Sequence, residues 1–471
     1  MFDVSNEEMT DGRISRTLLL LAAPLVAQNL VAVAQQVVDV FWVGRVGENA
    51  VAGVGLVIPL TALALVPSAL AVTGTHVLAS QRLGSGNDDG ARRVVWVGLG
   101  VALAIQLVTA AVALLFADTF VGLLGGTGMN AATADYAAIY LRVYAVGALV
   151  AALSDVLEMG LLAAGDSKAA LYINVASFGT NIVLDPFLVL GWGPFPRMEV
   201  FGAGLATVIG FLVGLLMAVL LVSGATRNFT LSRETFGFDL AAAREMVSIG
   251  GPSAGQQVAR QAARILVIFV VARAAGDPGL AAYTVGARIA TVAFVPAIGL
   301  GSAATSLVGQ NVGAGQPLRA RRATWTAVAI ALGGLTVLGV VQYAIPATVA
   351  HAFVPDLAGD GLRLTVDYLA ILALGYPALG AIHTVESGFN GAGRTDVSMY
   401  ATMLQYWAVR VPIAVIGSGV LAVGLGYGVH AVFWAVTLSN VAAALGLCLY
   451  FYASAERGLL SRAAADATAA D

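Results

Sequence analysis

The chain is poor in cysteine, in charge and in catalytic motifs. Cys448 is the one cysteine among 471 residues, which excludes an internal disulfide bond and a metal site built from cysteine thiolates. Charged residues make up 11% of the sequence, and the net charge of −3 gives no reason to expect a nucleic-acid partner. The nucleotide-binding pattern GxxxxGK[ST] is absent, and no soluble stretch is long enough for an ATPase domain. Neither an enzyme nor a cofactor is therefore expected.

Apolar sequence dominates instead, because 59% of the residues are hydrophobic and the mean hydropathy is +0.87. The apolar runs are near 20 residues long, which predicts an all-α polytopic membrane protein. Residues 1–15 are polar and unlike a cleavable signal peptide, so the first run is expected to stay as a helix. We count twelve transmembrane spans, near 16–42, 52–78, 93–117, 132–163, 169–191, 203–223, 245–273, 280–307, 322–345, 364–391, 397–417 and 428–453.

An even number of spans places both termini on one side of the membrane. The segments on that side carry fifteen basic residues, and the opposite loops carry four. The positive-inside rule then predicts a plasma-membrane protein with both termini in the cytoplasm. The polar C-terminal stretch 462–471 is expected to be a disordered tail.

Residues of the first half recur in the second half at a nearly constant spacing. The spacing is 228 or 229 residues, for example in Pro24/Pro252, Gln28/Gln256, Gln81/Gln310, Tyr140/Tyr368, Glu158/Glu386 and Gly165/Gly393. Such matches indicate a duplication. Six spans per copy predict two six-helix lobes around a central cavity, related by an axis along the membrane normal. The expected parts are an N-terminal lobe (1–223), a cytoplasmic linker (224–244) and a C-terminal lobe (245–471), and a monomer is expected.

The stretch 169–191 contains an acid where a bilayer disfavours one. Asp185 lies inside this apolar run, Pro186 follows it, and Asn181 is one turn earlier on the same face. A carboxylate at mid-bilayer costs about 2.5–3.5 kcal/mol on insertion scales, which favours a functional role. Pro186 cannot donate to the carbonyl of Ile182, so a polar position opens beside the acid. This pattern is typical of a proton or small-cation site.

Four spans of the first half carry polar groups at a similar depth. Asp39, Asp185, Thr207 and Tyr140, with Arg142 close by, are all expected in the outer half of the bilayer. Two acids buried together would share a proton, or bind sodium with amide and hydroxyl oxygens as further ligands. The candidate ion ligands are therefore Asp39, Asn181, Asp185 and Thr207. For Asp39 an interfacial position beside Arg45 is the alternative.

The duplication separates shared residues from unique ones. At a spacing of 228, Asp39 pairs with Val267, Asn181 with Val409 and Asp185 with Ile413, so the acidic site is expected in the N-terminal lobe alone. Residues kept in both copies, such as Glu158 and Glu386, are expected to be structural. The amides Gln35 and Asn29 are expected to line a substrate cavity with Tyr140. Four arginines inside the second-half spans are either structural or a cationic wall for an anionic substrate: Arg260, Arg264, Arg288 and Arg410.

The sequence resembles the multidrug and toxic compound extrusion (MATE) transporters over nearly its whole length. The resemblance rests on the twelve spans in two repeats, on Pro24 with Asp39, on QRLGSG and GQNVGAG, and on TNIVLDP around Asp185. It implies the archaeal and DinF-like branch, whose proton or sodium site would match Asp39, Asn181 and Asp185 here. Pro24 would match the family's hinge proline, with Pro186 as a second hinge. The resemblance implies an antiporter that exports amphipathic, mostly cationic compounds, and the alternative is a lipid-precursor or polysaccharide flippase.

Overall fold

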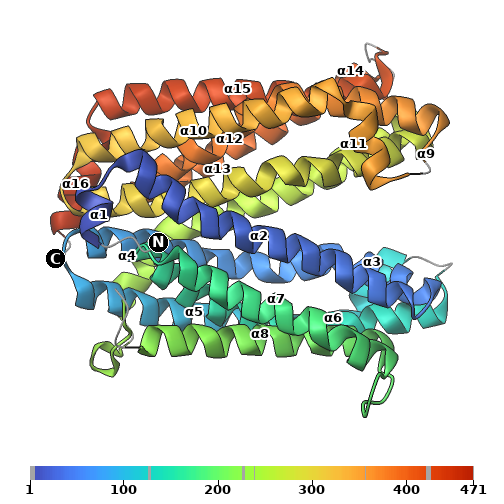
Figure 1. The fold of residues 1–471 in the computed structure, drawn as a ribbon, viewed down its shortest axis with the longest axis horizontal. Coiled ribbons are helices and arrows are strands. Elements are labelled where there is room, and N and C mark those ends of the chain that lie inside the picture. The colour runs from blue at the N-terminus through green and yellow to red at the C-terminus, as the bar shows by residue number, and fades with distance from the viewer. Residues whose placement is uncertain are drawn as a thin grey trace. The chain divides into compact units, whose positions relative to one another are not determined.

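The computed structural model describes residues 6–125, 129–224, 229–237, 239–355, 357–420 and 426–469, and within them the chain is helical without strands (Figure 1). The order of elements is α1 (Asn6–Asp11), α2 (Ile14–Gly44), α3 (Glu48–Leu65), η1 (Val66–Ser68), α4 (Ala69–Gly84), α5 (Asp88–Gly125), α6 (Ala131–Ala163), α7 (Ser167–Leu190), α8 (Glu199–Ser223), η3 (Arg233–Thr235), α9 (Leu240–Gly313), α10 (Pro317–Ala344), α11 (Pro346–Phe353), α12 (Gly359–Gly391), α13 (Thr395–Met403), the π-helical η4 (Leu404–Arg410), α14 (Val411–Ser418), α15 (Gly428–Glu456) and α16 (Leu459–Ala469).

The prediction of an all-α polytopic protein with twelve spans is confirmed. Ten helical stretches among the described residues are long and apolar enough to cross a membrane. One of them, α9, holds two spans, because Gly276 has non-helical backbone angles (φ 56°, ψ −146°). The one span still missing from this count, which precedes α15 in the chain, is the continuous helix 395–418, which consists of α13, η4 and α14.

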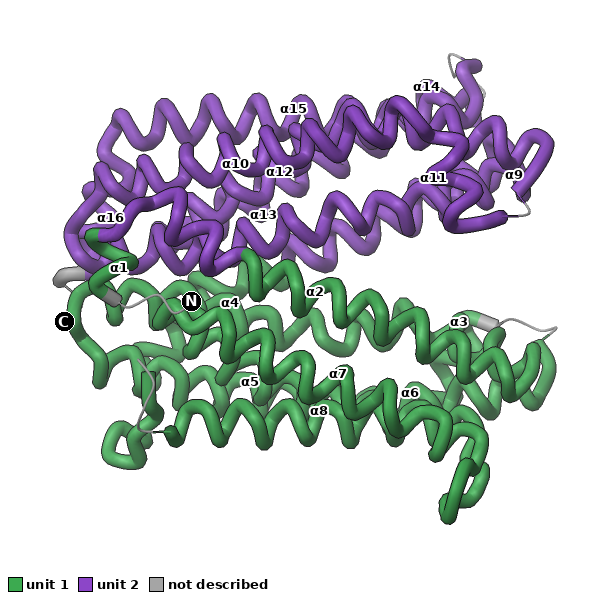
Figure 2. Tube along the Cα trace, viewed as in Figure 1, with its two compact units in different colours: residues 1–11, 23–254, 471 green, residues 12–22, 255–470 purple. Residues whose placement is uncertain are grey.

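The chain divides into two compact units, shown in two colours in Figure 2. Unit 1 comprises residues 1–11, 23–254 and 471, and unit 2 comprises residues 12–22 and 255–470. In unit 1, α6 packs on α5 and α8, and α7 packs on α8; in unit 2, α12 packs on α10 and α15. The expected lobe and linker boundaries stay a prediction, and residues 225–228 and 238 of that linker lie outside the described residues.

Corresponding helices of the two halves end in the same way. Gly165 after α6 and Gly393 after α12 both have positive φ (83° and 75°), a conformation that costs glycine little. In both turns the next amide donates back to the preceding helix, Asp166 N to Leu161 O at 3.0 Å and Arg394 N to Phe389 O at 2.9 Å. This closure satisfies carbonyls that a helix end leaves free. The sequence repeat therefore has a direct counterpart in local structure.

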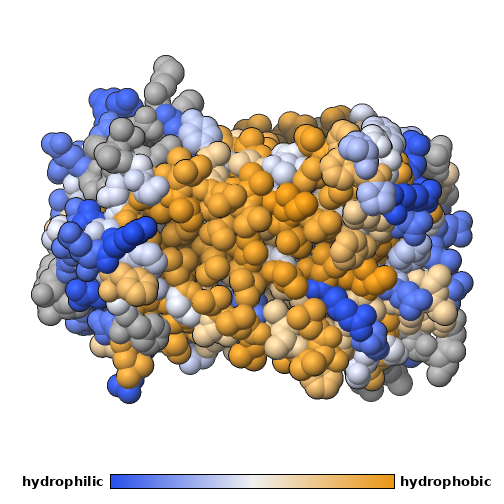
Figure 3. Space-filling model, turned by 90° about the horizontal axis from the view of Figure 1, so that it is seen from below, coloured by the Kyte–Doolittle hydropathy of each residue, from blue (hydrophilic) through white to orange (hydrophobic). Residues whose placement is uncertain are grey.

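Large apolar side chains cover the outside of the helices. Val108 and Leu115 on α5 are 66% and 77% exposed, for example. On the face shown in Figure 3, hydrophobic side chains occupy the middle and hydrophilic ones gather toward the two ends. Lipid chains accept such a surface, whereas water does not.

Bare backbone lets α7 and α8 approach closely. A Cβ atom on Gly202 would lie 2.4 Å from the carbonyl oxygen of Leu188, and one on Gly210 would lie 2.7 Å from that of Ser177. Small residues permit this close packing of membrane helices. The pair α7–α8 carries three of the four predicted ion ligands, Asn181 and Asp185 on α7 and Thr207 on α8, so glycines fix the distance between the two helices at this site.

The C-terminal segment differs from the expectation. Residues 459–469 form the helix α16, and Leu459, Leu460 and Ala464 on it are buried. The prediction of a disordered tail over 462–471 was wrong for this part, because an apolar face in a short alanine-rich stretch is enough to dock it.

Candidate ion-binding site

The α7 helix holds the acid and the amide that the sequence singles out. Asp166 caps the helix start, because its carboxylate accepts a hydrogen bond from Ala169 N at 3.0 Å. Asn181 and Asp185 lie one turn apart on the buried face, with exposed fractions of 2% and 0%. Pro186 continues the helix beside them. The helix therefore presents both polar groups to its neighbours and not to lipid.

Hydrogen bonds join three helices at this point. Gln35 of α2 donates to Asp39 and, at 3.0 Å, to Asn181 Oδ1. Asn181 Nδ2 donates to Thr207 Oγ1 of α8 at 3.2 Å. With the Asn181 amide turned over, its nitrogen donates to Asp39 Oδ1 at 2.9 Å and its oxygen accepts from Thr207 Oγ1 at 3.2 Å. In either orientation α2, α7 and α8 meet at one polar centre.

Asp39 and Asp185 are close neighbours, near enough for the charge of each carboxylate to act on the other. Neither buried oxygen of Asp185 has a hydrogen-bond partner among the described residues. Two carboxylates can form a hydrogen bond with each other only when one of them carries a proton. The alternative compensation is a cation between them, since carboxylate, amide and hydroxyl oxygens suit a hard cation such as sodium. The donor set thus fits either coupling ion.

Other predicted site residues take different positions. Tyr140 lies close enough to Asp39 and Asp185 for their charges to act on its hydroxyl group. Asn29 uses its amide on its own helix, donating to Leu25 O at 2.7 Å, and is not brought to the acids. Arg142 also stays apart, because it pairs with Asp118 at 2.6 Å. Its inclusion beside the acids was wrong, because a long side chain near a helix end reaches the interface.

Two further positions bear on Asp39 and on the hinge. The Arg45 guanidinium lies 4.9 Å from the ring centroid of Phe41, whereas Asp39 has Gln35, Asn181 and Asp185 as its neighbours. Pro24 lies inside the continuous helix α2, eleven residues before Gln35. Its role as a hinge stays a prediction.

A second polar network lies deeper in unit 1. Gln28 of α2 donates to Glu158 Oε1 at 3.1 Å, and Asn174 of α7 donates to Glu158 Oε2 at 2.8 Å. Asp155 lies one turn before Glu158 on α6, near enough to act on its charge. Hydrogen bonds therefore hold this carboxylate to α2 and α7.

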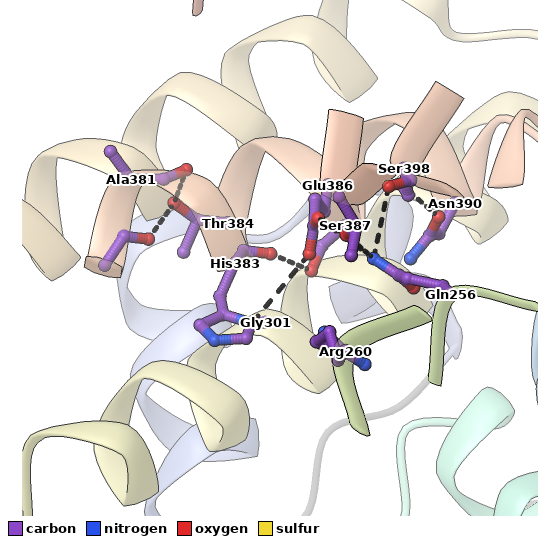
Figure 4. Close-up of polar contacts among 12 residues, drawn as sticks. Gln256, Arg260, Gly301, Ala381, His383, Thr384, Glu386, Ser387, Asn390 and Ser398 are labelled. Carbon is purple, nitrogen blue, oxygen red and sulfur yellow. Dashed lines mark hydrogen bonds and ion pairs between the residues drawn. The ribbon is translucent and has the colours of Figure 1, made fainter. Parts of the chain in front are cut away.

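Unit 2 repeats this network with other neighbours (Figure 4). Gln256 donates to Glu386 Oε1 at 3.0 Å and to Thr402 Oγ1 at 2.8 Å. All three residues are 228 positions after their counterparts Gln28, Glu158 and Asn174. Around Glu386, however, lie His383, with Nδ1 4.0 Å from Oε2, and Arg260. The expectation that the duplicated glutamates are structural stays a prediction that these contacts support.

The π-helical turn changes the pairing of the two halves. Before it, buried residues of α7 and of α13 correspond at a spacing of 228. After it they correspond at 229, in the pairs Asn181/Arg410, Asp185/Ala414, Leu188/Gly417 and Val189/Ser418. A π turn inserts one residue into a helix and so turns the face that follows. The sequence pairings Asn181/Val409 and Asp185/Ile413 were therefore wrong in space, and no spacing pattern in the sequence reveals the turn.

Both halves match one family model. The family described as MatE matches residues 24–187 and again residues 252–416, which together exceed half of the chain. The chain belongs to the MatE family. The two matches begin 228 residues apart and end 229 apart, which supports both the duplication and the extra residue.

Named relatives cover nearly all of this MatE chain. A probable multidrug resistance protein NorM of Burkholderia pseudomallei is 30% identical over 432 residues, covering 87% of this chain and 88% of its own. A protein of Shewanella oneidensis described as an FAD transporter is 25% identical over 445 residues, covering 93% and 94%. A crystal structure of MATE in complex with MaL6 superimposes with a TM-score of 0.87 at 22% identity, covering 97% and 99%.

These likenesses fix the general class of the protein. It is a multi-pass membrane transporter of small molecules, of the multidrug-efflux type, and not an enzyme. The assignment to the archaeal and DinF-like branch stays a prediction.

Proposed function

We propose that this MatE chain is an antiporter that exports small amphipathic compounds across the plasma membrane in exchange for protons or sodium. The observation that carries the proposal is Asp185, a fully buried carboxylate with no hydrogen-bond partner among the described residues and with Asp39 as its neighbour. Such a pair is unstable without a positive ion. Binding and release of that ion would supply the free energy for export.

The proposed cycle follows from the geometry of α2, α7 and α8. Asp39, Asn181, Asp185 and Thr207 bind the incoming ion on the outer side. Loss of negative charge removes the repulsion between the two acids, which lets α2 pack more closely on α7 and bend at Pro24. Export requires that ion and cargo favour different states of the carrier, so that one drives out the other.

Efflux from proteoliposomes tests this proposal. Wild-type protein should move ethidium, a fluorescent cation, under a pH gradient or a sodium gradient, and the gradient that works identifies the ion. Asp185→Asn should abolish gradient-driven transport and leave the yield of folded protein intact. Asp118→Asn serves as the matched control, because Asp118 is exposed and pairs with Arg142. Wild-type rates in Asp185→Asn would refute the ion site.

The alternative is a lipid-precursor or polysaccharide flippase, which rests on the arginines inside the membrane helices of unit 2. Liposomes that contain a fluorescent pyrophosphate-linked lipid distinguish the two. A flippase would expose this lipid to a membrane-impermeant quencher at a rate that depends on the protein, and an exporter would not.

A further inference from the structure

Arg410 and Asn181 occupy corresponding places in the two halves. Asn181 bonds Thr207 on α8, the last membrane helix of unit 1, and Arg410 bonds Ser439 and Asn440 on α15, the last membrane helix of unit 2. The repeated tyrosines agree with this pairing. Tyr140 lies within reach of the charges of Asp39 and Asp185, and Tyr368 lies within reach of the charge of Arg410. Unit 2 therefore has a cation where unit 1 has its acidic centre.

The charge of Arg410 is buried and has no negative partner. The residue is 9% exposed, and none of the described acids lies within 4.0 Å of it. Arginine cannot lose its proton in a protein, so this charge is permanent. Nε donates to Ser439 Oγ at 2.9 Å, Nη2 donates to Asn440 Oδ1 at 2.6 Å, and the Tyr406 ring centroid lies 4.0 Å away. Neutral partners of this kind orient the group without cancelling its charge.

One edge of the guanidinium stays available. Nη1 makes no hydrogen bond within the described part of the chain, so its two N–H groups can still bind an acceptor. The positive charges of Arg264 and Arg410 both act on the hydroxyl groups of Tyr283 and Tyr368. Arg264 on α9 therefore adds a second positive charge to this region. Two cations and three aromatic rings therefore share this part of unit 2.

The two glutamate networks also differ in the charge of their neighbours, which is negative in unit 1 and positive in unit 2. Asp155 stands beside Glu158 in unit 1, and at the spacing of 228 its counterpart in unit 2 is His383. Arg260 adds a positive charge beside Glu386 (Figure 4). No arginine is among the described neighbours that act on Glu158, whereas Glu386 has Arg260 beside it and Arg410 has no acid within 4.0 Å among the described residues.

We propose that Arg410 and Arg264 form an oxyanion-binding site in unit 2, which takes the carboxylate or phosphate group of an aromatic amphiphile. This proposal rests on the proposed export function and names the class of its cargo. The planar guanidinium would bind the two oxygens of the anion through one N–H of Nη1 and the second N–H of Nη2, and the tyrosine rings would pack against the aromatic part. The ion site of unit 1 would remain separate from this cargo site.

Two fluorescent dyes test the site on the purified full-length protein. Rhodamine 110 carries a carboxylate, and rhodamine 123 is its methyl ester, so the pair differs only in the anion. Wild-type protein should bind rhodamine 110 more tightly, and Arg410→Gln should lower the ratio of the two affinities about tenfold, the effect of losing one charge-assisted hydrogen bond. Equal affinities in the wild type, which need no variant, would overturn the proposal.

Further variants distinguish recognition from structural damage. Arg264→Gln, at an exposed position, should lower the same ratio by about threefold, a fraction of the loss expected for the buried arginine. Arg410→Lys should keep part of the preference, because it keeps the charge. Arg142→Gln, the same substitution at an arginine paired with Asp118, should leave the ratio unchanged. Equal weakening of both dyes by Arg410→Gln would show a merely structural role and overturn the proposal.

Failure of this site and failure of the export proposal give different results. Asp185→Asn should stop gradient-driven transport of both dyes and leave the ratio of the two binding affinities at its wild-type value, whereas Arg410→Gln should lower that ratio whatever its effect on transport. Loss of rhodamine 123 transport together with an unchanged binding ratio in Arg410→Gln would also contradict the oxyanion site.

Discussion

Glu158 and Glu386 are each bonded by a side chain from the first helix of their half. Because Gln28 and Gln256 donate to them at nearly equal distances, the two contacts join corresponding helices in both units. A buried amide that loses its acceptor costs more than the bond itself contributed. We therefore expect single side chains of this kind to matter more for folding than for transport.

We expect Glu158→Ala to lower the free energy of unfolding by about 1–3 kcal/mol, because it leaves the amide of Gln28 without an acceptor and takes from Asn174 one of its two acceptors, the other being Ala170 O. The matching change Glu386→Ala should have an effect of similar size. The midpoint of thermal unfolding in detergent measures the loss. Glu234→Ala, at an exposed site, should unfold at the wild-type temperature. A wild-type midpoint for both buried variants would contradict the structural role.

At the scale of whole elements, the helix 395–418 is the one whose local geometry changes the chemistry. Leu404–Arg410 is π-helical, and the residues after it present a face turned by one position. Helix α7, its counterpart, has no such turn. The inserted residue thus brings Arg410 inward and turns Val409 away from the corresponding place.

Deletion of Ala408 should be tolerated, because removal of one residue from a π turn restores a regular α-helix while the flanking turns keep their packing. Deletion of Val183 from α7 should abolish folding, because it rotates every later residue of a regular helix by about 100°. Both residues are exposed, so neither deletion removes a buried contact. Yield of monodisperse protein in size-exclusion chromatography distinguishes them. Equal loss in both deletions would argue against this view of the turn.

The sequence predicts much of the fold, and the reasons are visible in single residues. Runs of about 20 apolar residues can hardly be anything but spans, and Asp185 inside such a run is costly enough to be noticed. Depth alone identifies Asp39 as the neighbour of Asp185 and Thr207 as a residue of the same centre, where it bonds Asn181. The estimated depth in the membrane does not predict the contact of Arg142, whose long side chain reaches Asp118 and not the acidic centre. It also fails for Arg410, because a one-residue irregularity in backbone geometry has no signature in composition or spacing.

At the scale of the whole molecule, duplication lets one fold carry two opposite charges. The two family matches cover both halves, and the repeated turns show the same backbone geometry. Similar scaffolds with different polar residues would allow the two proposed sites, one for an ion and one for a cargo group, to lie in separate lobes. By linkage, if the bound ion changes the affinity for the cargo by some factor, the bound cargo must change the affinity for the ion by the same factor.

The orientation of the chain can be tested with single cysteines. On a Cys448→Ser background, Pro194→Cys in the loop after α7 should react with a membrane-impermeant maleimide added to intact cells. Arg462→Cys on α16 should react only after the cells are opened, because the basic segments are expected to face the cytoplasm. Both positions are exposed in the structure. The reverse pattern of labelling would contradict the predicted orientation.

The bare backbone between α7 and α8 has a further consequence. There is no room for a methyl group at Gly202 or Gly210, so the distance between Asn181 and Thr207 depends on these two residues having no side chain. An alanine at either position would push α7 and α8 apart and lengthen the distance between Asn181 and Thr207, while both acids would be unchanged. At the proposed ion site, uncharged substitutions between α7 and α8 would therefore be expected to change the preference between a proton and the larger sodium ion.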